Sequence, residues 1–415
     1  MSIAVVDGDR IVWTRGFGVT SVGGAAVNVT TLFPGSSISK AITATATLRL
    51  VDAGRLALDT DVSTYLRAWK VPDNEFTATK KVTLRRLLSH AAGTNVHAWK
   101  SYALDAAIPT LPQILDGVPP ANTEPIRVEA VPGTAFRYSG GGVEIEQLAL
   151  EDVTGEPFDA LMRTLVFEPI GMHESRFTAR LPPVQRARAA TAHDGDGAPI
   201  VDRVHPELAA DGLWTTPTDL MHWAIEIAAA RAGRSSRVLK RDTATAMLTV
   251  QQAPVGLGPF LGGAGRGFHF GHQGSDDGYH AELVYFPETG QGAAIMTNGA
   301  GGLLLIRELL FAIAAEYSWP DYAPEPVAAF AADAATLDRI VGVYEAPYDG
   351  MTVTITVTHA ADGLMVAVPV LGIRSDAVLT SPNTLVLLDS GDTLTVVGAA
   401  TALRFGPLEL PRRSK

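Results

Sequence analysis

Two residues near the start of the chain, Ser37 and Lys40, combine a hydroxyl and an amine at a spacing of three. On a helix, side chains three positions apart share a face, with Cβ atoms about 5–6 Å apart, so the amine can reach the hydroxyl. Such an amine can help to remove the serine proton and make the oxygen a nucleophile toward a carbonyl carbon. Pro34 and Gly35 precede Ser37, which predicts that Ser37 stands at a helix N-terminus, where the helix dipole favours negative charge. A helix start with a solvated lysine gives the same pattern, so the pair alone leaves both interpretations open.

The segment that follows Ser37 predicts the helix that would carry both groups. Residues 37–53 are rich in Ala, Leu and Thr, and Gly54 is a natural helix stop. Residues 3–6 and 11–14 are β-rich runs around an Asp-Gly-Asp turn, which predicts a hairpin. Further along the chain we expect helices over 84–89, 143–153 and 303–317, and strands over 268–270, 279–286 and 293–297.

The last quarter of the chain has a different pattern. Three prolines fall within residues 318–326, which is typical of a linker. Residues 352–358 then alternate polar and apolar side chains without a fault, which is the period of a half-buried strand. Strand character recurs over 364–370, 384–388 and 393–397. We therefore predict a linker over 318–334 and a small antiparallel, barrel-like β-domain over 335–415.

Several further segments accompany the Ser-x-x-Lys pattern. They are Thr31 to Lys40 continuing through Leu50 to Val62, Leu87-Leu88-Ser89-His90-Ala91-Ala92-Gly93-Thr94, Pro132-Gly133-Thr134-Ala135-Phe136-Arg137-Tyr138-Ser139-Gly140, Gly212-Leu213-Trp214-Thr215-Thr216-Pro217-Thr218-Asp219-Leu220 and Gly271-His272-Gln273-Gly274-Ser275. Together and in this order they strongly resemble the serine β-lactamase and penicillin-binding-protein superfamily, for which Ser-x-x-Lys is a signature. The most similar branch contains class C β-lactamases, family VIII esterases and D-aminopeptidases.

The resemblance covers residues 1–317 and implies a fold. It is an α/β (α+β) catalytic domain with an antiparallel sheet flanked by helices, made from residues 1–70 and 206–317. A mostly helical insert over 71–205 follows the first part, and the active cleft is expected between the sheet and this insert. The domain over 335–415 resembles the lipocalin-like β-domains that many relatives carry.

The resemblance also implies roles for single residues. Tyr138 takes the position of the general base and would act on Ser37, with Lys40 beside it because a phenol keeps its proton at neutral pH unless a cation is near. The alternative for Tyr138 is a core tyrosine with a satisfied hydroxyl. The backbone amides of Ser37 and Ser275 would form the oxyanion hole. Gly274 would let the substrate approach the strand closely.

Two positions depart from the family pattern. Gly140 stands where the family has the asparagine that holds an acylamino side chain, and His272 replaces the lysine that binds the carboxylate of a β-lactam or D-alanine. We assign both to the substrate site, together with His97 on a nearby loop. These departures favour an ester or amide substrate over an antibiotic. Asp276 and Asp277 follow, and they predict a solvated turn.

Composition excludes several classes of protein. Of the 415 residues, 47% are hydrophobic and 19% charged, which predicts a globular chain and not a disordered one. The net charge of −11 repels a phosphate backbone, so we expect no nucleic-acid partner. The chain has no cysteine, and His269 and His272 are three apart on a strand, which points them to opposite faces. We therefore expect no metal and no cofactor.

The same sequence limits location and function. No apolar run reaches the ~20 residues of a membrane helix, and no N-terminal stretch has the pattern of a signal peptide. We expect a cytoplasmic protein, or a secreted or periplasmic one if a leader was removed, with the oligomeric state open. The function hypothesis is a serine hydrolase that forms an acyl-enzyme with a small ester, an amide or a short peptide, as an esterase or a D-amino-acid peptidase or amidase. A non-catalytic binding or structural member of the fold, and an acyltransferase, remain alternatives.

Overall fold

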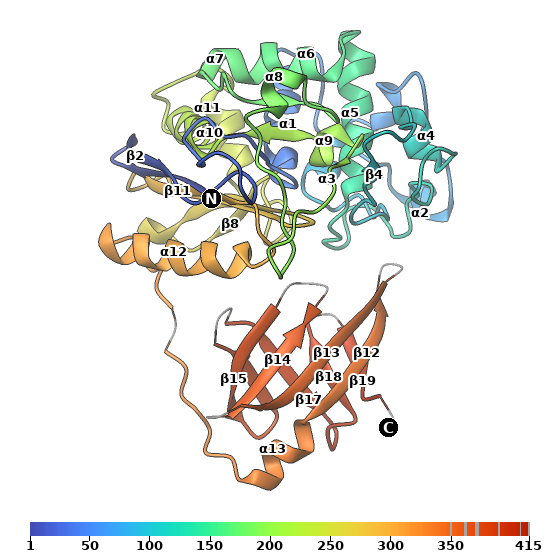
Figure 1. Cartoon of the computed structure of the whole chain (residues 1–415). Coiled ribbons are helices and arrows are strands. Elements are labelled where there is room, and N and C mark those ends of the chain that lie inside the picture. The colour runs from blue at the N-terminus through green and yellow to red at the C-terminus, as the bar shows by residue number, and fades with distance from the viewer. Residues whose placement is uncertain are drawn as a thin grey trace. The chain divides into compact units, whose positions relative to one another are not determined.

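The computed structural model describes residues 1–324, 326–348, 351–360, 363–369, 373–388, 391–406 and 408–413 (Figure 1). The chain divides into two compact units, of which the first contains residues 1–302 and 319–321 and the second contains residues 303–318 and 322–415. Glu325, in the expected linker, and Val370, at the end of an expected strand, lie outside the described residues.

A six-stranded antiparallel sheet forms one side of the first unit, with the order β2-β1-β11-β10-β9-β8. Its strands are β1 (Ser2–Asp7), β2 (Arg10–Gly16), β8 (Phe260–Gly262), β9 (His269–Asp276), β10 (Tyr279–Phe286) and β11 (Gln291–Thr297). The predicted hairpin is confirmed as β1 and β2. The three later strands are confirmed as β9, β10 and β11. The sheet thus joins the start of the chain to a segment almost 300 residues later, which the Ile3–Ile295 pair illustrates.

Two long helices pack on this sheet, α1 (Ile38–Asp52) and α10 (Pro217–Arg231) (Figure 1). The indole nitrogen of Trp223 on α10 donates a hydrogen bond to the Thr45 hydroxyl on α1 at 2.9 Å. Helix α1, which confirms the helix expected over 37–53, is buried over most of its surface and also contacts α5 (Gly140–Thr154). Its many small Ala and Thr side chains suit a helix that is covered on all sides.

The other elements of the first unit are short. The helices are α2 (Glu75–Thr79), α3 (Leu84–Leu88), α4 (Leu111–Asp116), α6 (Phe158–Met162), α7 (Glu168–Ile170), α8 (Pro183–Arg186), α9 (Leu208–Asp211) and α11 (Arg241–Met247), with single turns η1 (Val62–Thr64), η2 (Arg163–Phe167) and η3 (Gly265–Gly267). The strands β3 (Phe33–Pro34), β7 (Leu213–Thr215) and β5 (Arg176–Phe177) form one small sheet, and β4 (Tyr102–Ala103) and β6 (Arg203–Val204) another. Pairing of β3 with β7 fixes the chain just before it enters α1.

The second unit contains α12 (Gly302–Glu316) from Leu303 onward, α13 (Ala334–Ile340) and an eight-stranded antiparallel sheet. Its strands are β12 (Gly342–Tyr348), β13 (Met351–Ala360), β14 (Gly363–Val368), β15 (Ile373–Ser381), β16 (Thr384–Leu387), β17 (Thr393–Val397), β18 (Ala402–Phe405) and β19 (Leu408–Pro411). The sheet closes into a barrel, because the Arg413 amide after β19 donates to the Val343 carbonyl on β12 at 2.8 Å (Figure 1).

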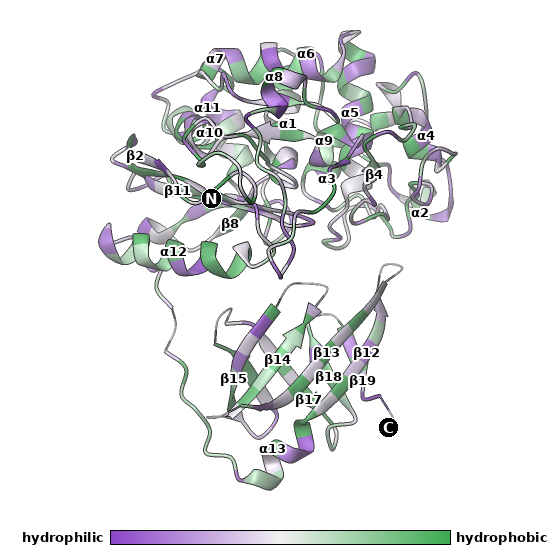
Figure 2. Cartoon of the chain, in the orientation of Figure 1, coloured by the Kyte–Doolittle hydropathy of each residue, from purple (hydrophilic) through white to green (hydrophobic). Residues whose placement is uncertain are grey.

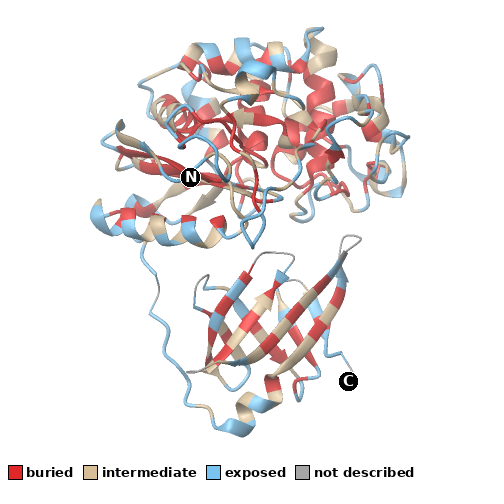
Figure 3. Cartoon of the chain, viewed as in Figure 1, coloured by how far each residue is buried: buried red, intermediate tan, exposed pale blue. Residues whose placement is uncertain are grey.

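Side chains in the barrel alternate as the sequence predicts. Val353, Ile355 and Val357 of β13 are buried, whereas the threonines between them are half-buried. Apolar and polar residues therefore alternate along the strands (Figure 2), and so do buried and more exposed ones (Figure 3). The barrel has a hydrophobic core of its own. No helix among the residues that the structure describes is long and apolar enough to cross a membrane.

Candidate active site

Ser37 and Lys40 meet at the start of α1. Ser37 is the N-cap residue, but its hydroxyl makes no cap hydrogen bond and instead accepts one from the Lys40 Nζ at 2.8 Å. The same Nζ donates to the carbonyl oxygen of Ala210 on α9 at 2.9 Å. Lys40 is only 4% exposed, whereas Ser37 is half-buried. A substrate can therefore reach the hydroxyl while the amine is shielded from water.

A buried carboxyl group, that of Glu144, holds the peptide whose carbonyl accepts a hydrogen bond from Lys40. The amide of Ala210, whose carbonyl holds Lys40, donates to Glu144 Oε1 on α5 at 3.0 Å. Glu144 is 0% exposed, and burial together with the nearby carboxyl of Glu207 raises the pKa of Glu144 well above its usual range. Burial raises the pKa of Glu207 to about 8. Both groups thus favour the neutral acid, and Glu144 can hold the peptide of Ala210 without a full charge beside Lys40.

Tyr138 lies over Lys40, just before α5. The Ser139 hydroxyl caps α5 by accepting the Gly142 amide at 3.0 Å, and this fixes the residue before it. The Tyr138 ring centroid is 5.2 Å from Lys40 Nζ. The rings of His90 and His97 pack against Tyr138 in tilted arrangements, at centroid distances of 4.3 and 4.8 Å. The structure therefore brings Tyr138, the expected base, next to Lys40, and His97 packs against Tyr138 on the same side of the site.

His272 faces Tyr138 from strand β9, with ring centroids 6.3 Å apart. Its Nδ1 is 2.6 Å from the carbonyl oxygen of Gln273, so Nδ1 carries a proton and Nε2 is a free acceptor. Burial, and then the charge of Lys40, lowers the pKa of His272 to about 3. His272 is hence neutral at physiological pH. Unlike the lysine of related enzymes, it offers no positive charge to a substrate carboxylate.

The edge of β9 faces the turn that precedes Ser37. Strand β8 pairs only with residues 269–271 of β9, which leaves the rest of that edge open. A Cβ on Gly274 would be 2.2 Å from the carbonyl oxygen of Gly35, so only glycine allows this approach. On β10, His280 is the residue opposite Ser275. Its carbonyl points away from β9 and accepts the Thr297 hydroxyl on β11 at 3.3 Å. Ser275 and His280 are then a non-hydrogen-bonded pair, and the Ser275 amide points toward the open edge.

Gly140 is covered by a tryptophan that the sequence did not single out. A Cβ at Gly140 would lie 2.8 Å from Trp99 Nε1 and 3.2 Å from the His97 carbonyl oxygen. An asparagine, as in the family pattern, would collide with the indole. Phe260 of β8 also joins the site, with its ring 5.1 Å from that of His272. Neither Trp99 nor Phe260 lies in a recognisable motif, and only the fold brings them here.

Asp276 corrects one expectation. We expected a solvated turn at Asp276 and Asp277, and Asp277 is exposed. The Asp276 side chain, however, is only 16% exposed, and its Oδ2 accepts the Ser36 hydroxyl at 2.6 Å. The sequence could not show this burial, because it comes from tertiary contacts: Ser36 and Asp276 are 240 positions apart in the chain.

His205, Asp211 and Asp276 form a group that could in principle hold a metal, with one ligand atom from each within 4.8 Å of the others. The two ring nitrogens of His205 face different carboxylates, since Nδ1 is 3.3 Å from Asp211 and Nε2 is 3.8 Å from Asp276. One ion can bind only one nitrogen of a ring. The arrangement therefore fits an imidazolium between two carboxylates better than a metal centre.

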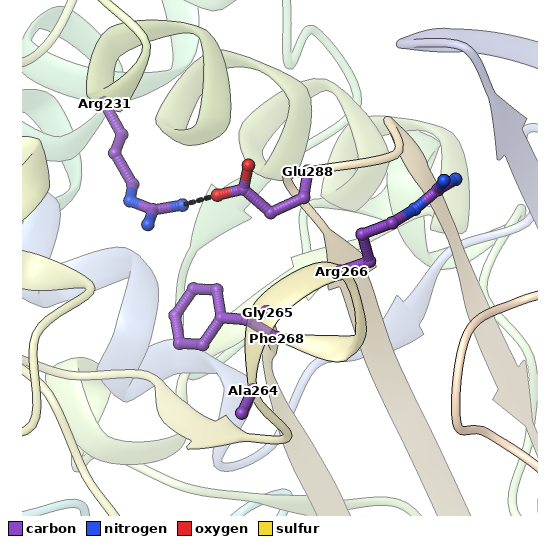
Figure 4. Close-up of a pocket in the computed structure, with 6 residues that line it drawn as sticks. All are labelled: Arg231, Ala264, Gly265, Arg266, Phe268 and Glu288. Atoms are coloured by element: carbon purple, nitrogen blue, oxygen red, sulfur yellow. Dashed lines mark hydrogen bonds and ion pairs between the residues drawn. The ribbon is translucent and has the colours of Figure 1, made fainter.

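A surface pocket of about 500 Å³ lies apart from these residues (Figure 4). It is lined by Arg231, Ala264, Gly265, Arg266, Phe268 and Glu288. Arg231 and Glu288 form an ion pair at 3.0 Å across it, as the dashed line in Figure 4 shows. None of its lining residues belongs to the Ser37 site.

Replacement of Gly274 with alanine tests the contact between β9 and the Ser37 turn. The new methyl group would push the strand from the Gly35 carbonyl and separate the amides of Ser37 and Ser275. We expect kcat to fall by about 10²–10³-fold, which is the cost of one oxyanion donor. Gly301→Ala is the matched control, because a Cβ there meets nothing within 4 Å. A Gly274→Ala enzyme with more than half of the normal kcat would contradict this geometry.

The antiparallel sheet, the buried helix α1 and the Ser37–Lys40 pair at its start define a serine hydrolase fold of the β-lactamase type. The chain belongs to the Beta-lactamase family, whose model matches residues 1–315. It is a serine hydrolase of this family.

Comparisons with individual proteins agree. Penicillin-binding protein 4 of Amycolatopsis lactamdurans is 30% identical over 333 residues, which are 73% of this chain and 84% of that protein. Esterase EstB of Burkholderia gladioli is 30% identical over 179 residues, 41% of this chain and 44% of the esterase. The octameric penicillin-binding protein homologue from Pyrococcus abyssi has the same fold, with a TM-score of 0.65 and 20% identity, over 99% of this chain and 95% of that one.

Proposed function

We propose that this protein hydrolyses an ester or amide through an acyl-enzyme on Ser37. The observation that carries the proposal is the 2.8 Å contact between the Lys40 Nζ and the Ser37 Oγ. Ser37 Oγ attacks the carbonyl carbon, and its proton passes to the Tyr138 oxygen, with the Lys40 amine beside both groups. The amides of Ser37 and Ser275 stabilise the oxyanion of the tetrahedral intermediate.

The same groups complete the cycle. The proton held by Tyr138 goes to the leaving alcohol or amine as its bond to the carbonyl carbon breaks, which leaves the acyl group on Ser37. A water molecule then attacks this ester, and its proton passes through Tyr138 back to Ser37 Oγ. The product is the free acid.

Two features of the site favour simple esters and amides over β-lactams. His272 is buried and neutral, so it offers a substrate carboxylate no charge. The Trp99 indole occupies the space beside Gly140 where an amide side chain would hold an acylamino group. The similarity to an esterase over 41% of the chain supports this preference.

A panel of p-nitrophenyl butyrate, D-amino-acid amides and nitrocefin tests the substrate class. We expect kcat/KM for the butyrate ester to exceed that for nitrocefin. Two groups that would bind a β-lactam are missing, a cation at position 272 and an asparagine amide at position 140. The Ser37→Ala protein provides the background rate for each substrate. A larger kcat/KM for nitrocefin would reverse the ranking and reject the preference for esters.

Labelling with a fluorophosphonate tests catalysis itself. The probe reacts only with an activated serine, and mass spectrometry of the digested protein locates the adduct. We expect a single adduct, on Ser37. A protein that binds ligands without catalysis would remain unlabelled.

A further inference from the structure

Asp276 connects the end of strand β9 to the turn before the nucleophile. It follows Ser275, whose amide points toward the open edge of β9, and its carboxylate accepts the Ser36 hydroxyl at 2.6 Å. Ser36 is 1% exposed and immediately precedes Ser37. One hydrogen bond therefore joins the neighbours of the two residues whose amides form the proposed oxyanion hole.

The backbone of Ser36 needs such a restraint. Its φ of 46° lies in the left-handed region, which residues other than glycine rarely adopt. Strained backbone of this kind persists only where its surroundings hold it. The Asp276 carboxylate and the contact of Gly274 with the Gly35 carbonyl are the two restraints from β9.

A second connection runs from Asp276 toward Lys40. The ring of His205 lies between Asp276, 3.8 Å from Nε2, and Asp211, 3.3 Å from Nδ1. Asp211 is the last residue of α9, and the residue before it, Ala210, accepts the hydrogen bond from Lys40 Nζ. The cluster of His205, Asp211 and Asp276 thus touches the turn before Ser37, the end of β9 and the last turn of α9, next to the carbonyl that accepts from Lys40.

We propose that this cluster is a positioning clamp of the active site, with Asp276 as its central residue. It sets the spacing between the Ser37 and Ser275 amides and the place of the Ala210 carbonyl under Lys40. The inference rests on the proposed function, since it concerns the geometry of that same acyl transfer. The three residues act through the groups they hold and take no part in bond making or breaking.

The clamp depends on charge. Burial, and next the Asp211 carboxylate, raises the pKa of Asp276 to about 7, against the opposite effects of His205 and Ser36. Burial lowers the pKa of His205, but the carboxylates of Asp276, Asp211, Glu207 and Asp277 outweigh this and raise it overall.

The protonation state of Asp276 determines how strongly the cluster holds together. Above pH 7 Asp276 is ionised and pairs with His205 and the Ser36 hydroxyl. As the pH falls through 7, Asp276 takes up a proton and this pairing weakens. We therefore expect the acyl-transfer rate to fall between pH 8 and pH 6.

The Asp276→Asn variant tests the clamp, because asparagine has the same shape but stays neutral. We expect kcat for the best ester at pH 8 to fall by about 10²-fold, as for a misplacement of about 1 Å. KM should change by less than about threefold, and the fall of kcat between pH 8 and pH 6 should disappear. The rate of fluorophosphonate labelling should drop with kcat. Asp105→Asn is the matched control, since its side chain is exposed and lies outside the cluster, and it should behave as the wild type.

A double-mutant cycle adds a readout that a purely structural role would not move. Ser36→Ala removes the other partner of the 2.6 Å hydrogen bond, so Ser36→Ala with Asp276→Asn should be no slower than the slower single variant. The melting temperatures show whether a loss of rate reflects unfolding. Equal kcat and pH profiles for Asp276→Asn and wild type, or a wild-type rate that needs added Zn²⁺ or is lost in EDTA, would overturn the clamp. A wild type that neither labels nor hydrolyses esters would instead reject the proposed function.

Discussion

Replacement of Ser37 with alanine is expected to abolish ester hydrolysis, with a loss of about 10⁶-fold in kcat, while the protein stays folded. The change removes only the nucleophile. Because the Ser37 hydroxyl makes no cap hydrogen bond to α1 and is half-buried, its loss takes little from the stability of the helix. Steady-state kinetics on p-nitrophenyl butyrate and thermal unfolding measure the two effects separately.

Ser39→Ala is the matched control on the same helix. The Ser39 hydroxyl is buried and accepts the Leu213 amide at 3.1 Å. Its loss leaves a buried donor unpaired, which costs about 1–3 kcal/mol of unfolding free energy. We expect lower stability with kcat reduced by less than about tenfold, which is the opposite pattern to Ser37→Ala. If Ser37→Ala kept more than a few per cent of the wild-type rate, the acyl-enzyme mechanism would be wrong.

Much of the fold follows from local signals in the sequence. The helix α1 begins and ends where Pro34, Gly35 and Gly54 predict it, because these residues act on the chain beside them. The strand β13 follows from the alternation of Thr with Val and Ile, which is a property of one short segment. Such signals need no knowledge of what the element packs against.

The candidate site divides in the same way. Ser37 and Lys40 could be paired from spacing alone, since three positions on one helix bring side chains together, and the structure places them 2.8 Å apart. Tyr138 and His272 were reached only through resemblance to a family. Neither residue spacing nor family resemblance pointed to Trp99 or Asp276. Asp276 looked like a solvated turn because the burial that sets its behaviour comes from segments far away in the sequence.

Lys40→Met and Tyr138→Phe are each expected to lower kcat by about 10⁴-fold or more, and the double variant should be no slower than the slower single one. Methionine keeps the apolar stem that fills the space around Lys40, and phenylalanine keeps the ring that packs against His90 at 4.3 Å. Each change thus removes one polar group with little loss of packing. Because both groups handle the same proton, loss of either one stops the transfer, and loss of the second adds nothing.

Two residues of the same types outside the site, the exposed Lys80 and the half-buried Tyr65, provide the controls for this cycle. Lys80→Met and Tyr65→Phe should leave kcat within about twofold of the wild type, since neither residue is part of the site. Fluorophosphonate labelling of the single and double variants separates proton transfer to Ser37 from later hydrolysis of the acyl-enzyme. Losses that multiply in the double variant would show that Lys40 and Tyr138 act on different steps. The proton of Ser37 would then pass to one of them alone, and the 5.2 Å approach of Lys40 Nζ to the Tyr138 ring would be packing without a catalytic role.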